Sequence, residues 1–291
     1  MQQSMRLKSF ELFAQDIDSV DVGLLHALSL SVGWSHRPKD WEFLRQVGKG
    51  IVAVDEIGRV FGSAMWFPHG DDFATIGLVI TTPRLQALGN GRWLMDHVMA
   101  QCGARNLCLN STKAAYILYH KLGFATEGTV QMHQGPMPMV PAARLALDGT
   151  IETLKPDALD EIAGLDRIAF GGDRRAHLAA FAKSASIRVL RRGGAIVGYS
   201  MCREFGRGYV IGPLVAADDN DAIHLTAVHM EDLGGRFLRV DTRSQGAYAD
   251  FLRRNGLTVA ETVTTMSKGR RFLTGKPGDP IVFGLAGHAL N

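Results

Sequence analysis

The chain has 291 residues, which is more than one hydrophobic core usually holds, so two domains of ordinary size are expected. Hydrophobic residues make up 46% and charged residues 21%, a composition that excludes a disordered chain or a coiled-coil polymer. The net charge of +3 is too small to indicate a nucleic-acid-binding or membrane-binding surface.

The cysteines and the apolar stretches exclude further classes of protein. Cys102, Cys108 and Cys202 are an odd number with no CxxC spacing, so neither a disulfide framework nor a metal site is expected. Residues 1–10 lack the apolar core of a signal peptide, and no apolar stretch reaches the roughly 18 residues of a membrane span. The sequence therefore predicts a cytoplasmic protein without metal, nucleic acid or membrane partners.

The apolar spacing of the first half predicts alternating helices and strands, with three strands before the glycine-containing loop in an antiparallel meander. In chain order, the expected elements are a strand at 10–13, helices at 18–32 and 38–47, strands at 51–54, 60–67 and 73–81, a helix at 92–102, a strand at 106–109, a helix at 113–122 and a strand from 124. Three prolines and a glycine at 134–141 are the clearest composition break, and we expect a linker there.

The second half of the sequence repeats the first in a weakened form. Residues 76–80 (IGLVI) correspond to residues 211–215 (IGPLV), 135 positions later, and Gly123 corresponds to Gly256. The remaining matched segments are a hairpin at 187–201, a strand at 238–241 and a helix at 246–255. Two copies of one α/β unit are therefore expected.

The loop 86–91 lies between a strand and a helix, where unpaired backbone N–H groups at a helix N-terminus converge on one point. Such a point attracts an anion, and glycine lets the chain approach a phosphate closely. No Gly-Lys-Ser/Thr follows, which excludes a nucleotide-hydrolysing P-loop, and the preceding meander excludes a dinucleotide fingerprint. A tight turn that binds nothing is the other interpretation.

Pro83-x-x-Gln86-x-x-Gly89-x-Gly91, followed 28 residues later by Tyr119 and the sequence HKLGF, resembles the GNAT N-acetyltransferases. In that superfamily the loop holds the pyrophosphate of acetyl-CoA, and the tyrosine protonates the departing thiol. Residues 170–175 and 211–216 extend the resemblance to bacterial tandem-GNAT proteins, so that it covers nearly the whole chain. It implies an α/β (α+β) fold of two tandem domains, each a mixed, mostly antiparallel twisted sheet flanked by helices.

The resemblance places the acetyl-CoA (coenzyme A) site in a first domain at 1–138 and makes the second domain, 139–291, a degenerate copy. The implied cofactor-binding residues are Leu78, Val79, Ile80, Gln86, Ala87, Leu88, Gly89, Asn90, Gly91, Arg92, Thr112, Ala115 and Tyr119. The backbone N–H of Val79 would face the thioester carbonyl. Ala87 replaces a frequent glycine, Thr112 replaces a frequent asparagine, and the strand before the loop lacks a glutamate base, which leaves the base unassigned.

The catalytic candidate is Tyr119. A phenol with a pKa of about 10, against about 8.5 for a thiol, stays protonated at neutral pH and can donate to sulfur. The alternative is a core aromatic on the inward face of its helix.

Base candidates lie in two polar loops, and none stands out. They are His36, Asp40, His69, Asp71 and Asp72, and a water relay is an equal alternative. Trp34 and His36 are the candidate acceptor-binding residues, because in the GNAT enzymes this inter-helix loop shapes the substrate side; core packing is the more common use of Trp41.

In the second half, the segment 216–221 presents three aspartates where the first half presents glycine amides, and these would repel a pyrophosphate. With Gly123 and Gly256 as anchors, Tyr119 maps to Leu252, so the acid is lost as well. Three roles remain for the second domain: a scaffold, a dimer surface, or a lid over the acceptor site of the first domain. The cluster Asp173-Arg174-Arg175 has two interpretations. It binds an acidic acceptor or the other domain, or it is a helix N-terminus with a solvated aspartate cap.

Together these patterns predict an acetyl-CoA-dependent N-acetyltransferase that acts on a small amine by direct attack of the amine on the thioester. The alternative is a non-catalytic acyl-CoA-binding sensor or regulatory module, and a third interpretation is a pair of interaction domains. Peptides, amino acids, polyamines and drug-like amines all remain open as acceptors. A homodimer is open as well, because exposed strand edges favour pairing.

Overall fold

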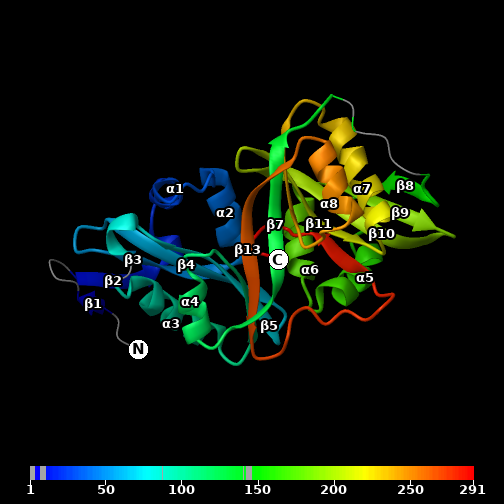
Figure 1. Ribbon diagram of the computed structural model, residues 1–291. Helices are drawn as coiled ribbons and strands as arrows, with labels where there is room; N and C mark the ends of the chain where they lie inside the picture. Colours follow the sequence, from blue (N-terminus) through cyan, green and yellow to red (C-terminus); the bar gives the residue numbers. More distant parts are fainter. Residues whose placement is uncertain (1–3, 7–10, 87, 140, 142–145) are drawn as a thin grey trace.

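The protein is described by a computed structural model that covers residues 4–6, 11–86, 88–139, 141 and 146–291. Across these residues the strands form one 14-stranded sheet in the order β1-β2-β3-β4-β5-β6-β13-β7-β12-β11-β10-β9-β8, with β14 paired to β11 off this path. Figure 1 shows the sheet passing through both halves, with β7 and β13 side by side at its centre. This mixed, mostly antiparallel sheet with flanking helices confirms the predicted fold class.

The first half contains seven strands and four α-helices within the described residues. They are β1 (Ser4–Arg6), β2 (Glu11–Asp16), α1 (Val22–Ser31), α2 (Pro38–Val47), β3 (Lys49–Val54), β4 (Val60–His69), β5 (Phe73–Thr81), α3 (Asn90–Cys102), β6 (Asn106–Ser111), α4 (Tyr116–Lys121) and β7 (Ala125–Pro136), with 3-10 turns at Ile17–Ser19 and Pro83–Leu85. The helix predicted at 18–32 is divided into a 3-10 turn and α1, because the Asp21 side chain accepts the Gly23 N–H and starts a new helix.

The second half follows a similar order. Its elements are β8 (Thr150–Thr153), α5 (Asp160–Phe170), α6 (Arg175–Ala182), β9 (Ser186–Arg192), β10 (Ala195–Phe205), β11 (Gly208–Ala216), α7 (Asp219–Asp232), β12 (Phe237–Thr242), α8 (Ala247–Arg254), β13 (Thr258–Lys268) and β14 (Ile281–Gly284). The hairpin, strand and helix expected from the internal repeat are β9–β10, β12 and α8. The sequence did not predict β14.

The two halves exchange their long strands. β7 of the first half pairs antiparallel with β12 of the second, and β13 of the second half pairs with both β7 and β6 of the first. Residues 134–136, predicted as the start of a linker, instead complete β7, because its backbone groups find partners on both neighbours. The domain boundary at 138/139 stays a prediction.

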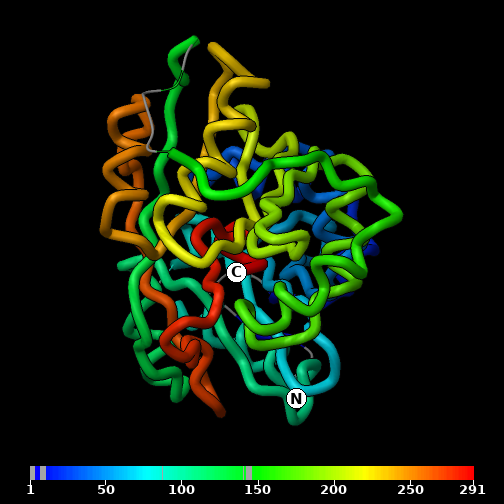
Figure 2. The backbone as a smooth tube through the Cα atoms, turned by 90° about the vertical axis from the view of Figure 1, so that its right-hand side faces the viewer, coloured from blue at the N-terminus to red at the C-terminus, as the bar shows by residue number. Residues whose placement is uncertain are grey.

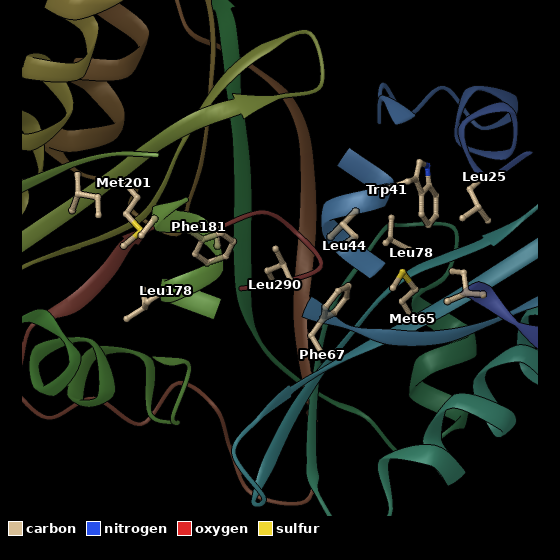
Figure 3. Close-up of a cluster of buried hydrophobic side chains, with 14 of the residues drawn as sticks. Leu25, Trp41, Leu44, Met65, Phe67, Leu78, Leu178, Phe181, Met201 and Leu290 are labelled. Atoms are coloured by element: carbon tan, nitrogen blue, oxygen red, sulfur yellow. The ribbon is translucent and has the colours of Figure 1, made fainter. Parts of the chain in front are cut away.

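Alternating side chains of the sheet face two layers of helices. On β3, Val52 and Val54 pack with α1 and α2, whereas Ile51 and Ala53 pack with α3. The α1–α2 side forms a core that both halves share. Figure 3 shows this shared core, in which Trp41, Leu44, Met65, Phe67 and Leu78 of the first half meet Leu178, Phe181, Met201 and Leu290 of the second.

The C-terminal segment after β14 lies in the middle of the molecule, as Figure 2 shows in red. It reaches the shared core through Ala286 and Leu290. Among the described residues, no helix is long and apolar enough to cross a membrane, and no group of three or more His, Cys, Asp or Glu side chains is arranged to hold a metal ion.

Candidate active site

The parallel pair β5–β6 separates halfway along its length. Residues 73–76 of β5 pair with residues 106–109 of β6, and the described register ends there. On the other edge of β5, the register with β4 shifts between Ser63 and Met65, so that Leu78 and Val79 have no Cα partner in the described ladder. Leu78 has a φ of 52°, and its carbonyl accepts the Ser63 hydroxyl at 2.7 Å. This bulge turns the backbone of β5 toward the gap.

The glycine-containing loop leads directly into α3. Gly89 has a φ of 91° as the N-cap, a left-handed conformation that glycine adopts without strain. The first helical bond runs from Trp93 N–H to Gly89 O at 3.0 Å, so the N–H groups of Asn90, Gly91 and Arg92 precede it. A Cβ at Gly91 would lie 3.2 Å from a Leu118 methyl, so glycine lets α4 pack closely there.

The side chains of this loop differ in their surroundings. Gln86 Nε2 donates to Thr81 O at 3.2 Å, Leu88 is exposed, and Arg92 is exposed beside Asp96. The Asn90 amide is fully buried with neither Oδ1 nor Nδ2 partnered. Ala87 lies outside the described residues. The N–H groups that precede the first helical bond, the positive end of α3 and the nearby arginine fit a pyrophosphate such as that of coenzyme A.

A cavity of about 260 Å³ adjoins the gap beside β5. Of the predicted site residues, it is lined by Trp34, His36, Leu78, Val79, Thr112, Ala115 and Tyr119. The remaining ones lie elsewhere: the loop residues and Arg92 stand at the N-terminus of α3, and Ile80 is buried in the shared core. The structure thus brings the predicted acid, the bulged strand and the predicted acceptor-binding residues to one chamber.

Tyr119 projects from α4 and is buried, with its ring edge-on to Phe124 at a centroid distance of 6.1 Å. Burial raises the pKa of its phenol further above the ordinary value. The hydroxyl is therefore protonated at neutral pH, as a proton donor requires. Its packing among core residues also fits the alternative of a structural aromatic.

His36 lies at the α1–α2 end of the cavity. Its ring packs against Trp34, Trp41 and Phe205 at centroid distances of 5.4–5.9 Å, and its Nδ1 is buried without a partner. Burial, aided by Arg239 and by His288 and opposed by Asp40, lowers the pKa of His36 to about 4. The ring is therefore neutral at pH 7.

The other base candidates are engaged away from the cavity. The buried Asp40 carboxylate accepts hydrogen bonds from Arg37 and from the Gly206 N–H at 3.0 Å. His69 is buried against Phe170 and His177, and its pKa falls well below the ordinary value through burial. Asp71 and Asp72 stand at the β4–β5 turn, where Asp72 pairs with Arg270 at 3.1 Å. None of the four belongs to the described lining of the cavity.

The second half supplies lining residues, most of them charged or polar, that the sequence did not predict. These lining residues are Arg203 and Phe205 from β10, Arg207 from the following turn, Arg239 from β12, Glu261 from β13 and His288 from the C-terminal segment. Burial raises the pKa of Glu261, Asp241 adds to the rise and Arg239 opposes it. No local motif marks these residues, because they reach the cavity through the packing of the second half against the first and, for Glu261, through the exchanged strand β13.

The equivalent gap in the second half is filled by the chain itself. β11 pairs with β12 only at Tyr209 and Val210, and β14 then pairs with the remainder of β11 at residues 214–216. At the start of α7 the Asp218 carboxylate accepts the Asp221 N–H at 2.9 Å, and Leu252 is buried at the position of Tyr119. Arg174 is also buried and paired with Asp166 at 2.7 Å, whereas the partly exposed Asp173 accepts the Arg175 N–H at 3.1 Å, as a solvated aspartate cap does.

Two regions of the sequence match family models. Residues 47–126 and residues 162–278 each match a model described as an acetyltransferase (GNAT) domain. No curated protein matches the chain.

Several solved structures share the fold. A putative acetyltransferase from Pyrococcus horikoshii has a TM-score of 0.80 at 16% identity, covering 100% of this chain and 99% of its own. A GCN5-related N-acetyltransferase from Sphaerobacter thermophilus has a TM-score of 0.62 at 17% identity, covering 91% and 98%. A tandem GNAT protein from the clavulanic acid biosynthesis pathway has a TM-score of 0.59 at 14% identity, covering 89% and 99%.

Proposed function

Since this chain belongs to the GNAT family of N-acetyltransferases and carries two such domains in tandem, we propose that its first half transfers an acetyl group from acetyl-CoA to the amine of a small acceptor. The observation that carries the proposal is the shared chamber, in which the bulged part of β5, Tyr119 and the α1–α2 loop meet. The N-terminus of α3 provides the complementary anion site within the same half.

The side chains and backbone of the chamber suit an attack of an amine on a thioester. Bound acetyl-CoA would supply that thioester. In the proposed mechanism the Val79 N–H, turned out of the ladder by the bulge, donates to the carbonyl oxygen as negative charge develops on it. Tyr119, protonated at neutral pH, gives its proton to the leaving sulfur.

The alternative is a module that binds acyl-CoA as a sensor without turning it over. It is favoured by one observation, that among the base candidates of the first half only His36 lines the chamber, and its pKa is depressed to about 4. The two functions differ in turnover, because a sensor releases coenzyme A no faster than solvent hydrolysis does.

The test follows free thiol release from acetyl-CoA in the presence of a panel of small amines. We expect amine-dependent release by the wild-type protein, together with calorimetric binding of acetyl-CoA. Binding without release for any amine would favour the sensor, and the absence of binding would contradict both functions.

A further inference from the structure

Arg203 is a buried arginine at the wall of the chamber, with only 4% of its surface exposed. Three rings, those of Phe43, Phe181 and Phe205, lie 5.1–5.4 Å from its guanidinium carbon. These rings position the cation and stabilise it in part, but they do not neutralise it.

The hydrogen bonding of Arg203 is incomplete. Its Nη2 donates to the carbonyl of Ala286, its Nε is buried without a partner, and no carboxylate of the described residues forms an ion pair with it. Burial lowers the pKa of Arg203 to about 10, which shows that its surroundings disfavour the charge. A buried cation of this kind is strongly stabilised by an anion that enters the cavity.

The chamber as a whole is cationic. Three arginines line it, Arg203, Arg207 and Arg239. Within the described part of the chain, only Arg239 is bound to a carboxylate, that of Asp241, through two hydrogen bonds of 2.7 and 2.8 Å. An acceptor with several amines, such as a polyamine, would meet this excess of positive charge and be repelled. An acceptor that carries a negative group would be attracted.

Glu261 is the sole carboxylate among the described residues that line the chamber. It stands on β13 opposite Met132 of β7, so the strand exchange carries it from the second half to the site of the first. A carboxylate here can pair with an ammonium group and take up a proton from it. The raised pKa of Glu261 suits this role.

The size of the chamber limits the ligand. Its volume, about 260 Å³, lies below the range of roughly 300–1,000 Å³ that is typical of sites for drug-sized molecules. Peptides and large amines are therefore disfavoured.

We propose that the acceptor is a small amine that also carries a carboxylate, a molecule of the amino-acid class, with its carboxylate paired to Arg203 and its amine facing Glu261. The inference rests on the proposed acetyl transfer and names its acceptor. In the transfer a C–N bond forms and the C–S bond breaks. Glu261 takes the proton that the ammonium loses before the attack, water takes the second proton of the nitrogen as the C–N bond forms, the sulfur receives the proton of Tyr119, and exchange with water restores both side chains.

The first experiment compares matched pairs of acceptors with the wild-type protein. Each amino acid is assayed beside the amine that it gives on decarboxylation, for example lysine with cadaverine and phenylalanine with phenethylamine, by thiol release from acetyl-CoA. We expect kcat/KM to favour the carboxylate-bearing member of productive pairs by about tenfold or more. Equal or better turnover of the decarboxylated amines overturns the proposal.

The second experiment tests the two residues. Arg203→Met keeps an apolar side chain among the rings, and we expect it to lower kcat/KM for the amino acid by about 10- to 100-fold while the decarboxylated amine changes less than about threefold. Arg45→Met, which removes an arginine that pairs with Asp18 away from the chamber, is the matched control. Equal losses for both members of a pair would contradict the role of Arg203.

Glu261→Gln should remove the acidic limb of the pH dependence of kcat/KM and lower kcat by about 100-fold or more. An unchanged pH profile contradicts the role of Glu261. The control variant is Glu56→Gln, which changes an exposed glutamate. If no amine supports thiol release, the proposed function fails. The acceptor class is then decided by thermal stabilisation in the presence of coenzyme A, which must be greater with amino acids than with their decarboxylated amines.

Discussion

The two gaps between parallel strands occupy corresponding places in the two halves and differ in what fills them. In the second half, β14 pairs with β11 and satisfies its backbone groups, and Asp218 caps the adjoining helix. In the first half the ladder between β5 and β6 ends at Ile76, and glycine and amide groups stand at the start of α3. A gap between two parallel strands can thus be closed from within by a strand of the same chain.

The same glycine occurs at both gaps and shows how the C-terminal segment passes them. A Cβ at Gly212 would lie 1.8 Å from the Leu285 carbonyl oxygen, and a Cβ at Gly77 would lie 2.3 Å from the Ala289 Cβ. The Asn110 amide donates to the His288 carbonyl at 2.8 Å. The segment thus fills the second gap and then forms one wall of the chamber at the first, while a scaffold, a dimer surface and a lid all stay open as roles of the second half.

The largest effect is expected from a charge placed at the open gap. Gly89→Asp should weaken acetyl-CoA binding by about 100-fold or abolish it, because the carboxylate repels the pyrophosphate at the start of α3. Gly89→Asn is the matched control, since asparagine has the same shape, tolerates the left-handed conformation and carries no charge. Calorimetry measures the acetyl-CoA affinity of both variants.

Equal acetyl-CoA affinity of the two Gly89 variants would contradict an anion site at the open gap. The comparison between the two gaps would also fail if the wild-type protein bound two acetyl-CoA molecules per chain, because the second gap is occupied by β14.

The second-largest effect is expected at Tyr119, the proposed proton donor. Tyr119→Phe removes only the hydroxyl, and we expect kcat to fall by about 100-fold with little change in the KM for acetyl-CoA. Leu252→Met at the corresponding buried position of the second half should leave kcat within about twofold. A Phe variant with wild-type kcat would identify Tyr119 as a packing residue.

A smaller effect separates the glycines of the two gaps. Gly212→Ala forces a methyl group against the Leu285 carbonyl and should lower the free energy of unfolding by about 1–3 kcal/mol without changing acetyl-CoA affinity. Gly77→Ala forces a methyl group against Ala289 and displaces the C-terminal segment at the chamber, so the acceptor KM should rise in addition to a fall of the unfolding midpoint. Denaturant unfolding and steady-state kinetics on both variants measure the contrast, and a reversed pattern would contradict it.

The sequence predicted the local elements well because they depend on local signals. β5 and α2 have the predicted bounds, since prolines, glycines and runs of apolar residues mark their ends. Strand exchange could not be predicted, because an alternating pattern shows that a strand is half-buried and not which strand it pairs with. Glu261 in the segment TVAETVTTM looks like an ordinary solvent-facing residue, and only the position of β13 beside β7 gives it a site.

The last predicted effect, a pH dependence of stability, tests whether the two halves unfold as one body. His69 of β4 and His177 of α6 meet at a ring distance of 4.6 Å in the contact between the halves. Burial, aided by Arg174 and opposed by Asp166, lowers the pKa of His177 to about 4. Because its pKa is lower in the folded state than the ordinary 6.5, stability is complete above pH 6.5 and falls as the pH drops toward 4, by up to about 3 kcal/mol.

All four tryptophans, Trp34, Trp41, Trp66 and Trp93, belong to the first half, so their fluorescence reports that half alone, whereas far-UV circular dichroism reports both. We expect the two transitions to coincide in denaturant at pH 7 and at pH 5, with the pH 5 midpoint lower. His177→Phe should reduce that difference. Separate transitions would show that the shared core around Trp41 and Phe181 does not couple the halves, and the second half would then be an appended domain rather than a wall of the chamber.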